Sequence, residues 1–166
     1  MLTIIPCTTD LFVFQFSFIN YGEHPSSALH NMKLNCTVLR FTSKPCNVKK
    51  VIPFLEKISN AHKLHSEKKS DVLVSITEAV NNAILHGNGC DEKKIVEIHA
   101  ITRGNVLSFT VSDQGNGFDY NNLPDPTSFE RLCECGGRGV FLMRQLSNAC
   151  RFQNNGRTVS IDFQIA

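Results

Sequence analysis

The sequence lacks the features that mark several common protein classes. Its 17 Lys and Arg residues nearly balance 15 Asp and Glu residues, for a net charge of +2, and the basic residues are dispersed. Nucleic-acid binding usually leaves a basic patch, so we do not expect it here. Neither the P-loop pattern G-x-x-x-x-G-K-[ST] nor a Rossmann G-x-G-x-x-G after a strand is present. The two commonest phosphate-binding loops are therefore excluded.

Cysteines with the spacing of a metal site are also missing. The nearest pair, Cys133 and Cys135, lacks the two-residue gap of a thioredoxin-like motif and has no second Cys or His pair nearby. The seven cysteines are odd in number and irregularly spaced, unlike a disulfide framework. We therefore expect reduced thiols in a cytoplasmic protein, and we assign no role to this pair.

The first 31 residues lack the marks of a signal peptide. They contain no Lys or Arg, and Asp10 precedes their apolar run, 11–19, which is too short to span a membrane. Phenylalanines alternate in this run and would fit an extra strand. Our preferred interpretation is that residues 1–31 are a poorly structured extension outside the core, and that residues 32–166 form the domain.

The rest of the chain has the size of one compact domain and a regular succession of apolar patterns. These patterns predict, in order, a strand over 34–41, a helix from about 48 to 65, a helix that ends at 87, a strand hairpin over 95–101 and 106–112, a helix after 137, and a closing hairpin over 150–165. Helices on one face of a mainly antiparallel, mixed sheet give an α+β two-layer sandwich.

Residues 119–136 form a polar segment that contains Pro124 and Pro126 and is too long for an ordinary connection. Loops of this length in compact domains are often functional, so we expect a lid.

A polar row crosses the second predicted helix. Glu78, Asn82 and His86 follow one another at four-residue spacing, which places a carboxylate, an amide and an imidazole along one helix edge. Asn82 can offer an oxygen to Mg²⁺, and Glu78 can orient or deprotonate an attacking hydroxyl. His86 can touch a phosphate or simply support the helix end. The alternative for the whole row is a solvated helix edge.

Two glycine motifs stand at the ends of predicted elements. Asp113-x-Gly115-x-Gly117 follows a strand and offers a fixed carboxylate, which can accept a hydrogen bond from an exocyclic amine such as that of adenine. Gly137-x-Gly139 opens a helix, where bare N–H groups and the helix dipole favour phosphate. Taken alone, the first motif can be a plain turn and the second a glycine-rich helix start without a ligand.

Together, the patterns E-x-x-x-N-x-x-x-H-G, D-x-G-x-G-F and G-G-R-G-V-F-L-M resemble the GHKL (Bergerat-fold) ATP-binding domains. Within this group they are similar to the anti-sigma-factor serine/threonine-protein kinases. The subfamily resemblance rests on Glu78 to Gly87, on 115–119 with Pro124-Asp125-Pro126, and on 136–146. It covers roughly residues 32–165.

The resemblance implies a Bergerat fold that binds ATP and Mg²⁺. Glu78 would be the general base, Asn82 the Mg²⁺ ligand and Asp113 the adenine anchor. The remaining nucleotide-binding positions would be His86, Gly115, Gly117, Gly137, Arg138, Gly139 and Thr158.

The resemblance also implies an anti-sigma factor that forms a homodimer. It would hold a sigma factor and phosphorylate a Ser or Thr of a STAS-type antagonist, with neither nucleic acid nor membrane as a partner. The alternative is a nucleotide-gated binding module without phosphotransfer. Glu78 favours the kinase, because a binding-only module has no need of a carboxylate there.

Overall fold

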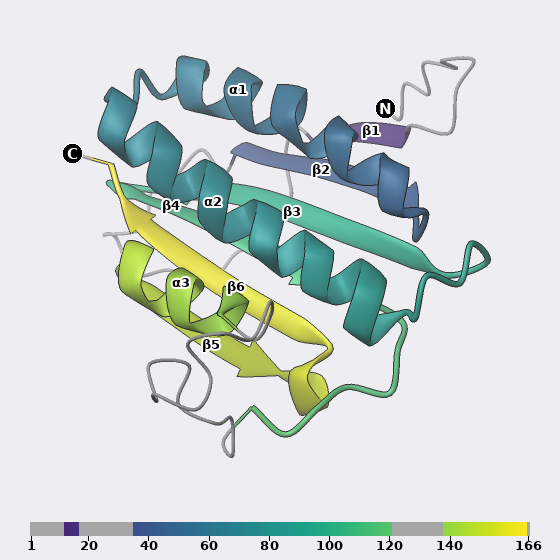
Figure 1. The fold of residues 1–166 in the computed structure, drawn as a ribbon. Coiled ribbons are helices and arrows are strands. Elements are labelled where there is room, and N and C mark those ends of the chain that lie inside the picture. Colours follow the sequence, from purple (N-terminus) through teal and green to yellow (C-terminus); the bar gives the residue numbers. More distant parts are fainter. Residues whose placement is uncertain (1–11, 17–34, 121–137, 166) are drawn as a thin grey trace, which may run out of the picture.

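The computed structural model describes residues 12–16, 35–120 and 138–165, and its strands form one six-stranded sheet (Figure 1). The strand order is β1-β2-β3-β4-β6-β5. All strand pairs among the described residues are antiparallel. The strands are β1 (Phe12–Phe16), β2 (Asn35–Thr42), β3 (Ile95–Arg103), β4 (Val106–Ser112), β5 (Ala149–Gln153) and β6 (Thr158–Gln164).

Three α-helices of the described chain cover one face of this sheet, with α2 lying between α1 and α3 (Figure 1). Their bounds are Val51–Ala61 for α1, Ser66–Asn82 for α2 and Gly139–Leu146 for α3. In the part of the chain with described structure, no helix is long and apolar enough to cross a membrane. The expected α+β two-layer sandwich with a mainly antiparallel sheet is confirmed.

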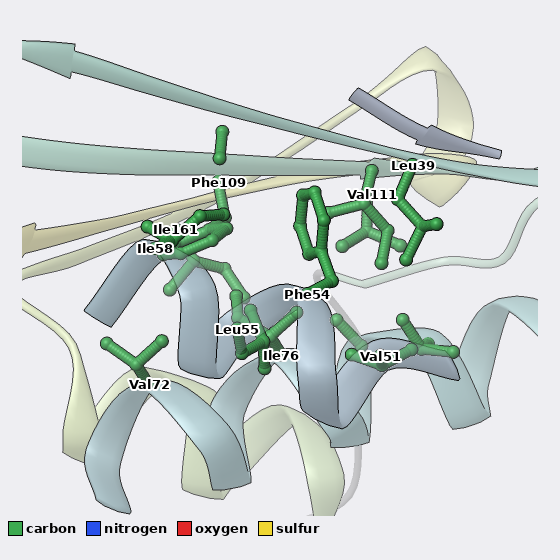
Figure 2. Close-up of a cluster of buried hydrophobic side chains, with 14 of the residues drawn as sticks. Leu39, Val51, Phe54, Leu55, Ile58, Val72, Ile76, Phe109, Val111 and Ile161 are labelled. Carbon is green, nitrogen blue, oxygen red and sulfur yellow. The ribbon is translucent and has the colours of Figure 1, made fainter. Parts of the chain in front are cut away.

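The hydrophobic core lies between the helices and the sheet. Side chains in β3 and β4 alternate between buried and half-buried, as expected for a sheet with one covered face. Figure 2 shows aliphatic side chains of α1 and α2 pointing toward Phe109, Val111 and Ile161 of the strands. The rings of Phe109 and Phe163 pack edge to face, with centroids 6.1 Å apart. This core fixes α2 against the strands whose ends carry the predicted site.

The first helical region differs in detail from the prediction. It opens with a 3₁₀ segment, Pro45–Lys50, and α1 ends at Ala61 rather than near residue 65. Pro53 lies in the first turn of α1, where a missing N–H costs no intrahelical bond. Lys63 has a left-handed φ of 52°, and this conformation ends the helix before α2 begins.

The N-terminal segment contributes a strand at the edge of the sheet. β1 pairs with β2 from Phe12 opposite Arg40 to Phe16 opposite Cys36. Phe12, Phe14 and Phe16 thus lie in a strand, as the alternative interpretation allowed. That residues 1–31 are dispensable for the core stays a prediction, and most of that segment lies outside the described residues. The predicted lid also lies largely outside them, since 121–137 are not described.

Candidate functional site

A pocket of about 320 Å³ lies between the end of α2, the start of α3, the end of β4 and the start of β6. Its size is within the range of small-molecule sites. The pocket brings together residues that are far apart in the sequence. Among the predicted site residues, those that line it are Asn82, His86, Asp113, Gly117 and Gly139.

The end of α2 widens into a π-helical turn, Ala83–Gly87. The N–H of Asn88 donates to the carbonyl of Ala83 over 2.8 Å, five residues back rather than four. Such a turn changes the direction of the side chains that follow it, and π-turns often occur at functional sites. His86 therefore belongs to a wider turn than Glu78 and Asn82, and it is exposed and lines the pocket.

The start of α3 lies directly against the polar row of α2. A Cβ added to Gly139 would stand 2.8 Å from Oε2 of Glu78 and 3.2 Å from Nδ2 of Asn82. Gly139 is buried and α3 packs beside α2, so any side chain at this position would displace the ends of the Glu78 and Asn82 side chains (Figure 1). The predicted phosphate-binding helix start and the predicted catalytic row are therefore in contact. Glu78 itself is half-buried beside the pocket and does not line it.

Asp113 follows β4 and is half-buried at the pocket wall. Its Oδ1 accepts a hydrogen bond of 2.8 Å from the N–H of Gly115, and its own N–H donates to the carbonyl of Arg157. Burial raises the pKa of Asp113, and this effect outweighs the opposing effects of the Gly115 N–H and of the positive charges on Arg157 and Lys94. Its Oδ2 accepts no hydrogen bond from the described residues and is therefore the acceptor that remains for a ligand.

Both glycines of the Asp113 motif allow close packing of the backbone, and a Cβ on Gly117 would stand 2.0 Å from the carbonyl oxygen of Asn155. Gly117 lines the pocket with a left-handed φ of 82°. A Cβ on Gly115 would stand 1.8 Å from the carbonyl oxygen of Gly87, so this glycine lets the loop pack against the end of the helix. Gly115, one of the predicted nucleotide-binding positions, does not line the pocket and contacts Gly87 instead.

Thr158, another predicted nucleotide-binding position, does not line the pocket either. Its hydroxyl is buried and lies 3.2 Å from the Ser112 hydroxyl, and it accepts a hydrogen bond from Nδ2 of Asn154. Side chains alternate along a strand, so Val159 faces the pocket and Thr158 faces the other side of the sheet. Its observed contacts hold the start of β6.

The remaining predicted positions belong to the segment before α3. Arg138 is exposed just before α3 and does not line the pocket. Gly137, Cys133 and Cys135 lie outside the described residues.

An aromatic group at the pocket was not predicted. Phe118 and Phe152 line the pocket with ring centroids 5.5 Å apart, and Tyr120 stacks on Phe152 at 5.3 Å. Phe118 is the last residue of the D-x-G-x-G-F pattern, but no sequence signal joins it to Phe152. The pairing of β5 with β6 brings Phe152 opposite Val159 and so to the pocket. These rings offer a flat apolar surface near the Asp113 carboxylate.

Comparison with known proteins agrees with this arrangement. Residues 41–163 match the family of the histidine kinase-like ATPase domain. The chain is 31% identical over 106 residues to the anti-sigma F factor of Geobacillus kaustophilus. The aligned segment covers 60% of this chain and 72% of that protein. The chain is also 31% identical over 100 residues to the serine-protein kinase RsbW of Bacillus subtilis, covering 55% of this chain and 61% of the kinase.

A third relative shares a shorter and more similar segment. The chain is 43% identical over 53 residues to the anti-sigma F factor of Clostridium perfringens strain 13, which is 32% of this chain. The match spans only 38% of that relative's length. The family match, in contrast, extends from β2 to β6 and includes the whole described pocket. This chain belongs to the histidine kinase-like ATPase domain family.

Proposed function

We propose that this chain is an ATP-dependent serine/threonine-protein kinase that acts as an anti-sigma factor and phosphorylates a STAS-type antagonist. The observation that carries the proposal is the contact of Gly139 with Glu78 and Asn82. A helix start suited to phosphate and a carboxylate suited to proton transfer lie within a few ångströms of each other. Phosphoryl transfer to a hydroxyl requires this combination of groups.

The pocket fits an adenine nucleotide. The available oxygen of Asp113 can accept a hydrogen bond from the exocyclic amine of adenine, and Phe118 and Phe152 provide apolar ring surface close by. Gly117 contributes backbone to the same wall, and the carbonyl of Asn155 occupies the place of its missing side chain. Val159 lines the pocket, and its neighbour Thr158 would support this wall by holding the start of β6.

The opposite end of the pocket fits phosphates and Mg²⁺. The N-terminus of α3 at Gly139 would attract phosphate, with further contacts proposed from Gly137, Arg138 and His86. Asn82 would give its amide oxygen to Mg²⁺, which keeps most of its waters and needs few protein ligands. Bound ATP would supply the transferable phosphoryl group.

Glu78 would act on the protein substrate. Its carboxylate lies beside Gly139, at the edge of the proposed phosphate site, where it would accept the proton of a Ser or Thr hydroxyl. The rest of the site would hold the reacting groups in place.

The partners are proposed from the relatives. The name anti-sigma F factor supports a sigma factor as partner, and the name serine-protein kinase supports a protein substrate. An antagonist of the STAS type, a homodimer and a cytoplasmic location are proposed from the family resemblance alone. The second candidate is a nucleotide-gated binding module without phosphotransfer. The position of Glu78 beside Gly139 favours the kinase.

Two substitutions test the assignment. We expect Asp113→Asn to abolish ATP binding in calorimetry, and Glu78→Ala to keep ATP binding but lose phosphotransfer from labelled ATP. Asn81→Ala is the matched control, because Asn81 is a half-buried neighbour on α2 that does not line the pocket. Full phosphotransfer by Glu78→Ala would show that the general base is another group.

A further inference from the structure

Asn88 is a buried asparagine at the end of the π-helical turn, and its side chain joins three segments of the chain. It is 2% exposed. Its Nδ2 donates to the hydroxyl of Ser43 over 2.5 Å and to the carbonyl of Ile95 over 3.1 Å. Its Oδ1 accepts from the backbone N–H of Gln114 over 2.8 Å. Asn88 therefore connects the end of α2 to the end of β2, the start of β3 and the loop after β4.

The chemistry of the partners fixes the orientation of this amide. The carbonyl of Ile95 can only accept a hydrogen bond, and the N–H of Gln114 can only donate one. A flipped amide would lose both bonds. The orientation of Asn88 therefore follows from its backbone partners, and it is the acceptor oxygen that reaches the loop carrying Asp113.

The hydrogen bond from the Gln114 N–H to Asn88 holds the residue that directly follows Asp113. The side chain of Gln114 accepts a 2.8 Å hydrogen bond from the N–H of Ile95. The backbone after Asp113 is thus held to β3 and to Asn88 together. On the other side, Gly87 presses against the Asp113 carboxylate, since a Cβ there would lie 2.5 Å from Cγ. Gly87 and Asn88 are adjacent residues of one turn. Through the Gly87 contact and the Asn88 hydrogen bond, this turn fixes where the Asp113 carboxylate lies in the pocket.

We propose that Asn88 is a positioning residue that sets the preference of the pocket for adenine over guanine by fixing Asp113. The inference rests on the proposed ATP site. Adenine presents an amine at its C6 position, whereas guanine presents an oxygen there. A carboxylate held at one depth accepts from the amine and repels the oxygen. A displaced carboxylate loses the bond to adenine without weakening the binding of guanine.

The test is the ratio of the dissociation constants for GDP and ADP, measured by calorimetry on the full chain. Loss of one well-placed hydrogen bond corresponds to roughly tenfold in affinity, so we expect Asn88→Ala to lower this ratio about tenfold. Asn88→Asp keeps an acceptor for the Gln114 N–H and should keep most of the preference. Ser43→Ala is the matched control: it removes one partner of Nδ2 and leaves the Gln114 bond, so the ratio should stay unchanged.

A purely structural role for Asn88 predicts a different result. General loosening of the fold would weaken ADP and GDP equally, and an unchanged ratio in Asn88→Ala would overturn the inference. Equal loss of preference in Asn88→Asp and Asn88→Ala would also overturn it. A wild-type chain that binds neither nucleotide would overturn the proposed function itself, and the inference with it.

Hydrogen exchange provides a measurement that does not depend on the folding of any variant. In the wild-type chain, bound ADP should slow exchange of the Gln114 amide more than bound GDP does, because only adenine donates a hydrogen bond to the adjacent Asp113 carboxylate. Equal slowing by both nucleotides would contradict the positioning role.

Discussion

Gly87 and Asp113 are in direct contact, although 26 positions separate them in the sequence. A Cβ on Gly87 would lie 2.5 Å from Cγ and 2.6 Å from both carboxylate oxygens of Asp113. Real Cβ atoms do not approach other atoms this closely, so one of the two residues must move when Gly87 is replaced. The end of the π-helical turn thus forms one wall of the proposed base-recognition site.

This contact predicts the effect of Gly87→Ala. The Asp113 side chain should rotate away from the added Cβ, because a side-chain torsion changes more easily than the hydrogen-bonded backbone of the turn. Overpacking of this kind typically costs about 1–3 kcal/mol, and we expect ATP affinity to fall by at least about tenfold. Calorimetric titration with ATP measures the loss.

Gly89→Ala is the control for this substitution. Gly89 has a left-handed φ of 63° and no atom within 4 Å of an added Cβ. Its replacement should cost stability through backbone strain, on the order of 1–2 kcal/mol, and leave ATP affinity unchanged. Equal ATP affinity in both variants would mean that Gly87 does not act through Asp113.

The pKa of Asp113 predicts a pH-dependent gain in stability for Asp113→Asn. Burial raises this pKa in the folded chain, so the folded state binds the proton more tightly than the unfolded state. The charged carboxylate therefore costs stability at neutral pH, and the cost disappears below the ordinary pKa of an aspartate. Asparagine can still accept the Gly115 hydrogen bond without carrying the charge.

Urea denaturation checks this sign. Asp113→Asn should have a higher free energy of unfolding than wild type at about pH 7, and the difference should vanish near about pH 3, below the ordinary aspartate pKa. The same variant should bind no ATP. A variant less stable than wild type at neutral pH would show that burial is not the dominant influence on this carboxylate.

Gly139→Ala should separate catalysis from folding. Gly139 is the first residue of α3 and does not have a left-handed φ, so alanine should not weaken the helix itself. The added Cβ would press on the carboxylate of Glu78 at 2.8 Å and displace it. We expect phosphotransfer to fall by much more than the affinity for ADP, with no loss of thermal stability.

A double mutant makes the Gly139 prediction specific. If Gly139→Ala acts through Glu78, it should have little further effect on phosphotransfer in a Glu78→Ala background, because contacting residues are not additive. If Gly139→Ala lowered phosphotransfer in the Glu78→Ala background as much as in wild type, it would act on another group, such as the bound phosphates.

A chain that begins at Met32 tests the domain assignment. We expect it to fold and to bind ATP as the full chain does, because the pocket residues all come from elements after β1. The truncation leaves β2 as the edge strand, since β1 pairs only with β2 in the described sheet. Circular dichroism and ATP titration measure the outcome. Loss of solubility or of binding would show that residues 1–31 belong to the domain.

Local patterns in the sequence predicted the order of the elements. The alternation in β3 and β4 and the helical period of α2 depend on which face is buried, and this can be read from neighbouring residues. The close approaches could not be predicted in this way. The contacts of Gly139 with Glu78 and of Gly87 with Asp113 depend on how α3 and β4 pack beside α2 in the folded chain.

The same reason explains why several site details differ from the prediction. A four-residue spacing predicted His86 in line with Asn82, but the π-helical turn depends on a bond from Asn88 that no periodicity reveals. Motif position alone could not separate Gly117, which lines the pocket, from Gly115, which packs on the helix end. Phe152 reaches the pocket through strand pairing late in the chain.

The most direct test of the proposed kinase is capture of partners by the wild-type chain and by Glu78→Ala, with Mg²⁺-ATP, from a lysate of the encoding organism. The phosphorylation sites of the captured proteins are then mapped. We predict a STAS-like protein that carries a new phosphoserine or phosphothreonine with the wild-type chain and none with Glu78→Ala. A partner that is captured by both chains and phosphorylated by neither would contradict the kinase and support a nucleotide-gated binding module.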